Sequence, residues 1–153
     1  MDLTLRRAER HDVPELVRLL ADDVLGKDRE EASDSVDQRY WRAFSSIDED
    51  ERQLLIVAET DGKVVGTMQL TFIQYLTFLG GERAQIEAVR VAHAYRGLGI
   101  GRRMLEWAID RARSRGCHVV QLTTNRRRQG VRGFYESIGF EATHHGMKLT
   151  LTP

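Results

Sequence analysis

One short stretch of this sequence combines residue types that suit the binding of a phosphate group. It reads Arg96-Gly97-Leu98-Gly99-Ile100-Gly101, and it follows an extended apolar run and opens a helical pattern. Glycines at alternate positions leave the turn free of bulky side chains, so backbone N–H groups can converge on one point. The helix behind the turn adds the positive end of its dipole, and Arg96, Arg102 and Arg103 add charge. The alternative is a loop that needs glycine only for a tight turn.

Neither of the two common nucleotide-binding loops accounts for this stretch. A Walker A loop ends in Gly-Lys-Ser/Thr, whereas Gly101 is followed by Arg102. A dinucleotide fingerprint needs a third glycine at the position that Arg102 occupies after Gly97 and Gly99. A different phosphate-bearing ligand is therefore indicated.

The stretch resembles motif A of the GNAT family of N-acetyltransferases, in which a strand, Arg/Gln-x-x-Gly-x-Gly/Ala and a helix bind the pyrophosphate of acetyl-CoA. A second mark of that family, the run from Phe134 to Phe140, follows at the expected distance, and the resemblance covers residues 53–151 well. It implies an acetyl-CoA-dependent enzyme with acetyl-CoA as cosubstrate. The implied cofactor-binding groups are the backbones of Arg96, Gly97, Leu98, Gly99, Ile100, Gly101 and Arg102 at the pyrophosphate, and those of Val89, Arg90 and Val91 along the pantetheine arm.

Acetyl transfer to an amine also needs a base, because an ammonium with a pKa of about 10 is not a nucleophile. Glu87 is the leading candidate, since a charged residue within a largely apolar strand usually has a specific role. Strand alternation predicts Glu87, Val89 and Val91 on one face. The resemblance implies the base role, because in many members of the family a Glu at this place acts through a water. The rivals are His93 and the pair His144-His145, and the simplest alternative is a surface or ion-paired Glu.

The acid that protonates the departing thiolate is predicted to be Tyr135, because the Tyr of the family's Phe-Tyr pair lies beside the cofactor sulfur. The alternative is a packed aromatic residue whose hydroxyl is satisfied locally. Val91 N–H is the predicted oxyanion donor. Cys117 has no base adjacent in sequence, so a small buried residue is the better interpretation. No His, Cys, Asp or Glu spacing suggests a metal site.

The sequence departs from the family at one position. An Asn often lies seven residues before the Tyr and bonds the pantetheine, but Arg128 occupies that place here. Asn125, followed by basic residues, resembles the small-amine subgroup that includes aminoalkylphosphonate N-acetyltransferases. Asn125 is therefore a candidate for the pantetheine contact and Arg128 for a cofactor phosphate, with a solvated basic turn as the alternative for Arg128.

Composition limits the class of protein. The chain has 153 residues, 41% hydrophobic and 30% charged, with 23 Lys plus Arg against 23 Asp plus Glu. These values predict a single domain over residues 1–153 and no general attraction to nucleic acid or membrane. A single cysteine and the absence of a signal peptide or apolar span predict a cytoplasmic protein.

The periodicities predict the elements that position these residues. A mixed α/β fold is expected, with a central sheet of about six or seven strands flanked by helices, as in the GNAT family. Asp12 and Glu15 predict a capping box before a first helix that carries Val24 near its end at Gly26. Asp61-Gly62 predicts a hairpin. The other predicted elements are strands at 3–6, 53–58, 63–75, 84–91 and 118–122, helices at 36–47, 100–116 and 130–137, and one or two strands within 140–151. The strand at 63–75 is expected to have a bulge or close-approach point at Gly66, and the strand at 118–122 to be buried.

Two of the predicted helices carry a stripe of apolar or aromatic residues. The helix at 100–116 is expected to have Ile100, Met104, Ala108 and Ala112 in one apolar line. The helix at 36–47 carries Val36, Tyr40, Phe44 and Ile47 at helical spacing. The simpler interpretation of this aromatic stripe is core packing, and the alternative is a wall of the amine site.

The leading functional prediction is an N-acetyltransferase that moves an acetyl group to the primary amine of a small molecule in a ternary complex. The alternatives are a protein acetyltransferase acting on Lys or an N-terminal amine, and a non-catalytic acyl-CoA-binding module. The substrate wall is expected within residues 33–47 and 75–81. The resemblance also implies a possible homodimer.

Overall fold

The computed structural model describes residues 1–23, 25–33, 35–128 and 130–152. Val24, predicted on the first helix, lies outside these residues. They form two compact units, Met1–Gln121 and the residues from Leu122 onward. No helix within the described ranges is long and apolar enough to cross a lipid bilayer.

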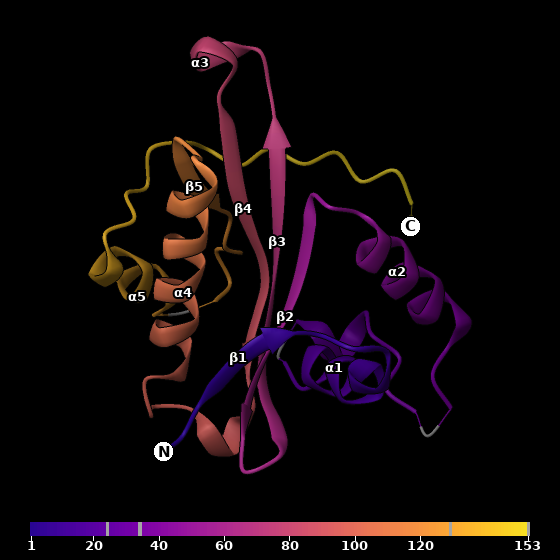
Figure 1. The fold of residues 1–153 in the computed structure, drawn as a ribbon. Helices are drawn as coiled ribbons and strands as arrows, with labels where there is room; N and C mark the ends of the chain where they lie inside the picture. The colour runs from indigo at the N-terminus through magenta and orange to yellow at the C-terminus, as the bar shows by residue number, and fades with distance from the viewer. Residues whose placement is uncertain (24, 34, 129, 153) are drawn as a thin grey trace. The chain divides into compact units, whose positions relative to one another are not determined.

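The element order agrees with the predicted order up to the last helix (Figure 1). In sequence it runs β1 (Thr4–Arg7), η1 (Arg10–Asp12), α1 (Val13–Ala21), η2 (Gly26–Asp28), α2 (Gln38–Glu49), β2 (Gln53–Thr60), β3 (Lys63–Gln74), α3 (Thr77–Gly80), β4 (Glu82–Val91), η3 (His93–Tyr95), α4 (Ile100–Arg115), β5 (Val119–Leu122) and α5 (Val131–Ile138).

The sheet has the strand order β1-β2-β3-β4-β5, and the pairs β1–β2, β2–β3 and β3–β4 are antiparallel. Asp61 and Gly62 have φ values of 50° and 71°, so the predicted hairpin turn between β2 and β3 is confirmed. Contacts of β5 advance along β4 in the same direction, from His118 beside Glu82 to Gln121 beside Gln85. The sheet is therefore mixed, as the β4–α4–β5 crossover requires.

Helix α4 covers one face of the sheet, which we call the α4 face. Its predicted apolar line is confirmed, because Ile100, Met104, Ala108 and Ala112 are all at most 1% exposed. Gly66 of β3 allows the close approach, since a Cβ there would lie 3.0 Å from Met104 Sδ. This fits the prediction of a close-approach point at Gly66.

Helices α1 and α2 pack on the opposite face, the α1/α2 face. Their side chains form one buried cluster with Ala8 and with Val57 of β2. The buried members from the two helices are Val13, Leu16, Val17 and Phe44, and Val36, Tyr40 and Trp41 pack against them. The aromatic stripe of the second helix is thus largely core packing, which was the simpler of its two interpretations. Alternation along β2 places Gln53 and Leu55 on this same face.

Asp12 does not cap α1 as predicted. Its side chain makes no cap hydrogen bond there, and the capping box instead joins Glu9 and Asp12 around η1. Asp12, only 3% exposed, accepts two hydrogen bonds from Arg6, at 2.8 and 2.9 Å. Burial alone raises the pKa of Asp12, but the bonds from Arg6 and from Glu9 N–H outweigh it and lower the pKa. A bidentate hydrogen bond from an arginine stabilises a buried carboxylate more than a single bond from a backbone N–H at a helix start does.

We expect Asp12→Asn to lower the free energy of unfolding by about 2–3 kcal/mol at neutral pH, because Arg6 loses a buried charged partner. Because the folded pKa is depressed, the contribution of Asp12 is present above its unfolded pKa of about 3.9 and fades as pH falls through the folded value. Urea unfolding at a series of pH values should show the difference from wild type shrinking in acid. Asp110→Asn, at an exposed ion pair with Arg113, is the matched control and should change stability by less than about 0.5 kcal/mol.

The predicted count of about six or seven strands is wrong, because the described residues form a sheet of five. Among the described residues of the segment 140–152 there is no strand, and Met147, Leu149 and Leu151 are 92%, 86% and 88% exposed. Their alternation suits a half-buried strand, but a strand forms only where a neighbour pairs its backbone. The prediction that β5 is buried is also wrong at Val119, which is 39% exposed.

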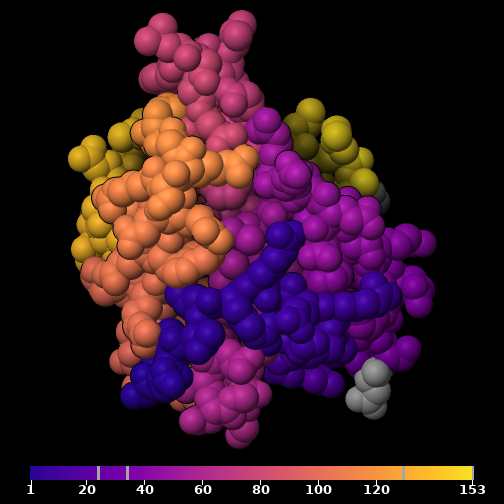
Figure 2. Space-filling view, viewed as in Figure 1, coloured from indigo at the N-terminus to yellow at the C-terminus, as the bar shows by residue number. Residues whose placement is uncertain are grey.

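The connection between β3 and β4 stands out from the surface of the first unit (Figure 2). Leu76, Phe78 and Leu79 there are 92%, 73% and 105% exposed. Phe78 and Leu79 adopt left-handed backbone conformations, with φ values of 53° and 58°. This tip belongs to the segment predicted as part of the substrate wall, and that role stays a prediction.

Candidate active site

The glycine turn has the backbone that its sequence predicts. Gly97 and Gly99 lie in the left-handed region, with φ values of 77° and 81°, which other residues adopt only with strain. A Cβ added at either position would meet no atom within 4 Å. The turn therefore presents bare backbone to open space, as a close ligand requires.

The turn ends at the amino terminus of α4, a helix of 16 residues. Gly99 is its N-cap and offers no side-chain oxygen, and the first turn holds no acidic residue. The first N–H groups of a helix have no partner within it, so those of Ile100, Gly101 and Arg102 suit an anion. This geometry fits the predicted pyrophosphate site.

The Arg96 side chain is held by two backbone carbonyl groups, and its contribution to the phosphate site stays a prediction. Its Nε donates to Val91 O at 3.0 Å, and its Nη2 donates to Asp22 O at 3.4 Å. The side chain thus ties the turn to β4 and to the residues after α1. Arg102, 3.6 Å from Glu106 on the next helical turn, lies at the surface of α4. The backbone of the turn, more than its arginines, is what the structure offers to a phosphate.

Among the described residues of the first unit, no strand pairs with the outer edge of the last part of β4, which we call the open edge. Strand β5 has four residues and begins beside Glu82, so β4 runs past its end from about Glu87 onward. Ala92 N donates to Val65 O at 2.8 Å. Because such groups alternate along an antiparallel strand, the N–H and C=O of Val91 point away from β3. The predicted pantetheine contact needs such an edge.

Two carbonyl groups of this edge already accept one hydrogen bond from an arginine side chain. Val89 O accepts from Arg90 Nη1 at 2.8 Å, and Val91 O accepts from Arg96 Nε. Arg90 Nη2 lies 3.5 Å from Asp23 Oδ2, and both side chains are 11% exposed. A carbonyl has two lone pairs, so each can accept a second bond, and Val91 N–H stays directed at the open edge.

The predicted alternation of Glu87, Val89 and Val91 on one face is wrong. The register pairs Gln69 with Glu87 and Thr67 with Arg90, so Ala88 and Val89 both lie opposite Met68. Ala88 has a φ of 54°, which marks a β-bulge. The extra residue reverses the phase of the strand, so Glu87 shares the α1/α2 face with Arg90, whereas Val91 shares the α4 face with Gly66.

Glu87 is exposed and accepts a hydrogen bond from Gln85 Nε2 at 2.8 Å. It makes none of the ion pairs found among the described residues, although Arg90 lies on the same face. An accessible carboxylate with one oxygen held by an amide can bind a water or an amine. An exposed Glu without an ion pair fits the simpler alternative of a surface Glu as well as the predicted role, so the base role stays a prediction.

The remaining predicted residues belong to the second unit. Tyr135 of α5 packs between Phe134 and Phe140, with ring centroids 5.3 and 5.8 Å away. Asn125 Oδ1 accepts from Arg127 N at 2.9 Å, and Asn125 O accepts from Arg128 N, also at 2.9 Å. Local turn bonds therefore occupy part of Asn125, and its pantetheine contact stays a prediction, as does that of Arg128.

The alternative nucleophile and two of the alternative bases each lie close to a neighbouring side chain. Burial and the neighbouring Glu82 raise the pKa of the Cys117 thiol, which disfavours the reactive thiolate. His93 Nδ1 lies 3.3 Å from Arg96 Nη1, and His144 Nδ1 lies 2.6 Å from Thr143 Oγ1. No cluster of three metal-ligating side chains occurs among the described residues.

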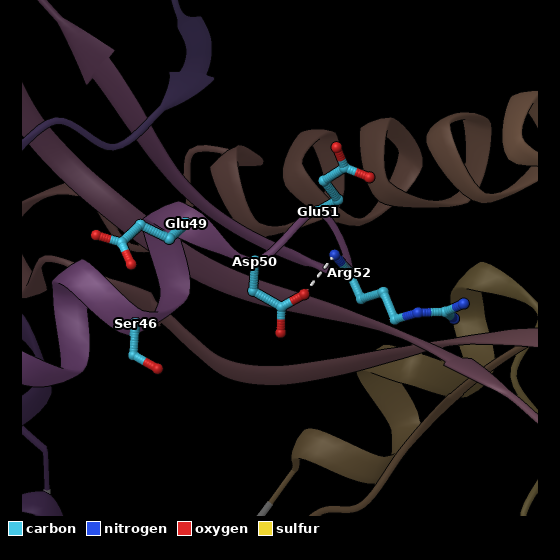
Figure 3. Close-up of a pocket in the computed structure, with 5 residues that line it drawn as sticks. All are labelled: Ser46, Glu49, Asp50, Glu51 and Arg52. Atoms are coloured by element: carbon cyan, nitrogen blue, oxygen red, sulfur yellow. Dashed lines mark hydrogen bonds between the residues drawn. The ribbon is translucent and has the colours of Figure 1, made fainter.

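A surface depression at the junction of α2 and β2 contains none of the predicted catalytic or cofactor-binding residues, although its Ser46 belongs to the predicted substrate wall (Figure 3). Its lining includes three consecutive charged residues of the turn, where Asp50 Oδ1 accepts from Arg52 N at 2.9 Å. The full lining is Ser46, Glu49, Asp50, Glu51 and Arg52. An open acidic turn of this kind has no cradle for a nucleotide, so the bare turn before α4 is the better candidate.

The family follows from sequence comparison. The model of the Acetyltransferase (GNAT) family matches residues 14–140 of this chain, which belongs to that family. It is accordingly an acetyl-CoA-dependent N-acetyltransferase, and the resemblance predicted from the glycine turn is confirmed.

Three similar proteins illustrate the range of relatives. A crystal structure of a transcriptional regulator from Bacillus halodurans is 45% identical with a TM-score of 0.96, covering 98% of this chain and 100% of that one. An uncharacterized N-acetyltransferase of Archaeoglobus fulgidus is 28% identical over 88% of this chain and 90% of its own length. The aminoalkylphosphonate N-acetyltransferase of Salmonella typhimurium is 31% identical over 58% of this chain and 56% of its own.

Proposed function

We propose that this enzyme acetylates the primary amine of a small molecule, by direct attack in a ternary complex with acetyl-CoA. The observation that carries the proposal is the left-handed glycine turn at the uncapped start of α4, beside the open edge of β4. These two features offer N–H groups to a diphosphate and a free backbone edge to an amide-containing arm. The similarity to an aminoalkylphosphonate N-acetyltransferase favours a small amine over a protein.

The reaction then proceeds in one displacement. The amine nitrogen attacks the thioester carbonyl carbon, and Val91 N–H stabilises the oxyanion that forms. Glu87 accepts the amine proton through a water, which keeps the amine nucleophilic near neutral pH. As the C–N bond forms, the C–S bond breaks, and the Tyr135 hydroxyl supplies a proton to the departing thiolate.

The acceptor class is tested by measuring CoA release with matched panels. One panel holds aminoalkylphosphonates, amino sugar phosphates and simple amines, and the other holds peptides with a Lys or a free α-amine. The proposal expects turnover that saturates with one or more small amines. Turnover confined to the peptides would instead identify a protein acetyltransferase, and acetyl-CoA binding without any turnover would contradict catalysis.

We expect Tyr135→Phe to lower kcat by about tenfold or more, because the thiolate loses its proton donor. The ring and its packing between Phe134 and Phe140 are retained, so thermal unfolding should stay unchanged. Steady-state kinetics with a saturating amine measures the effect. Tyr95→Phe is the matched control, and an equal loss in both variants would remove the acid role from Tyr135.

A further inference from the structure

A continuous chain of hydrogen bonds ends on the carboxylate of Glu87. Arg83 Nη1 donates to Gln121 Oε1 at 2.9 Å, and Gln121 Nε2 donates to Gln85 Oε1 at 2.8 Å. Gln85 Nε2 in turn donates to Glu87 Oε1 at 2.8 Å. The chain crosses from β4 to β5 and back, so residues on two strands are linked in series, and Gln85 makes the final bond to the carboxylate oxygen.

The ends of the chain fix its direction. A guanidinium can only donate hydrogen bonds and an ionised carboxylate can only accept them, whereas an amide does both. Rotating either glutamine amide by half a turn would bring two donors or two acceptors together. Gln121 and Gln85 therefore have one satisfiable orientation each, and their dipoles line up from the cation toward the anion.

Arg83 is itself held in place. Its guanidinium carbon lies 4.0 Å from the centre of the Tyr75 ring, a cation–π contact. Its Nε atom is buried and has no hydrogen-bond partner among the described residues. The ring below and Gln121 beside it thus determine the orientation of the cation that starts the chain.

We propose that Gln85 and Gln121 are positioning residues for the base. They hold Oε1 of Glu87 so that Oε2 faces the water that receives the amine proton. This inference rests on the proposed function, in which Glu87 is the base. An exposed Glu otherwise samples several rotamers, and misplacing a catalytic group by a small distance lowers the rate without altering cosubstrate binding.

Gln121→Glu tests the chain at its middle with almost no change of shape. The substituted carboxylate still accepts from Arg83 but cannot donate to Gln85, so the Gln85 amide turns and withdraws its N–H from Glu87. We expect kcat to fall by about three- to tenfold, the range of one hydrogen bond, with KM for acetyl-CoA unchanged. Gln85→Met removes the last link directly and should give a similar loss, which keeps the test valid if Gln121→Glu fails to fold.

Gln53→Glu is the matched control. Gln53 lies on the same sheet face but only accepts, from Gln69 Nε2 and Thr71 Oγ1, both at 2.9 Å. The control adds the same negative charge but keeps both hydrogen bonds that the residue 53 side chain accepts, so kcat should stay within about twofold of wild type. An equal loss in the control would attribute the effect to charge on this face and overturn the positioning role.

A double-variant cycle separates the two proposals. With Glu87→Gln already present, Gln121→Glu should lower kcat no further, because the chain has no base left to position. If Glu87→Gln lowers the rate but Gln121→Glu acts equally in both backgrounds, or not at all, the positioning inference is wrong and the base assignment stands. If Glu87→Gln itself has no effect, the base assignment fails and the inference fails with it.

Discussion

Replacing Gly99 by valine weakens acetyl-CoA binding by about a hundredfold, if the bare turn before α4 holds the diphosphate. Gly99 is the N-cap of α4, and the Cβ of a residue there would enter space that is empty within 4 Å. A branched side chain fills the volume that the phosphate oxygens need. The φ of 81° adds strain, since a β-branched residue in the left-handed region costs about 1–2 kcal/mol or more.

Gly62→Val separates strain from ligand exclusion. Gly62 has a φ of 71°, and a Cβ there would also meet nothing within 4 Å, but it lies in the β2–β3 turn. Both variants should therefore lose similar thermal stability, and only Gly99→Val should lose affinity in a calorimetric titration with CoA. Unchanged affinity in Gly99→Val would remove the pyrophosphate assignment, which is the premise of the whole active site.

Much of the first unit was predictable because its signals are local. The glycine turn, the Asp61-Gly62 hairpin and the apolar line of α4 each depend on a few adjacent residues or on one helical period. The structure confirms all three. The strand count failed for the opposite reason, because whether residues near Met147 and Leu151 form a strand depends on a partner that no local pattern specifies.

The bulge at Ala88 shows where pattern reasoning fails within the site. Nothing about alanine signals a left-handed conformation, so the sequence predicts an unbroken alternation of faces from Glu87 to Val91. One inserted residue reversed the phase and moved Val91 to the other face relative to Glu87. The backbone roles of Val89 and Val91 are unaffected, because the open edge, not the face, decides them.

Gln85 and Gln121 were missed by the sequence reading. Neither is an acid, base or nucleophile, and they lie on different strands, so no spacing connects them. Only the sheet register brings them together. The one sequence signal for such a positioning residue is a polar side chain on a strand beside the candidate base. Gln69 and Thr71 fit that description equally well, so the signal does not single out Gln85 and Gln121.

The second large effect concerns the base. We expect Glu87→Gln to lower kcat by about a hundredfold near neutral pH, because an amide cannot accept the amine proton. The loss should diminish as pH rises toward the amine pKa of about 10, since more of the substrate is then already deprotonated. Measuring kcat of wild type and variant with one saturating amine across this range gives the ratio directly.

Glu15→Gln is the control for the carboxylate-to-amide change. Glu15 lies on α1, 45% exposed and paired with Arg18 at 3.0 Å, so the variant should keep wild-type kcat throughout. The diagnostic result is the shape of the ratio, because a misfolded or misaligned site loses rate equally at every pH. A flat deficit would therefore move the base role to His93 or His144. Of these, His93 is tested first by substitution with Gln, because it follows directly on β4 and is tied by Arg96 to the carbonyl edge of Val91.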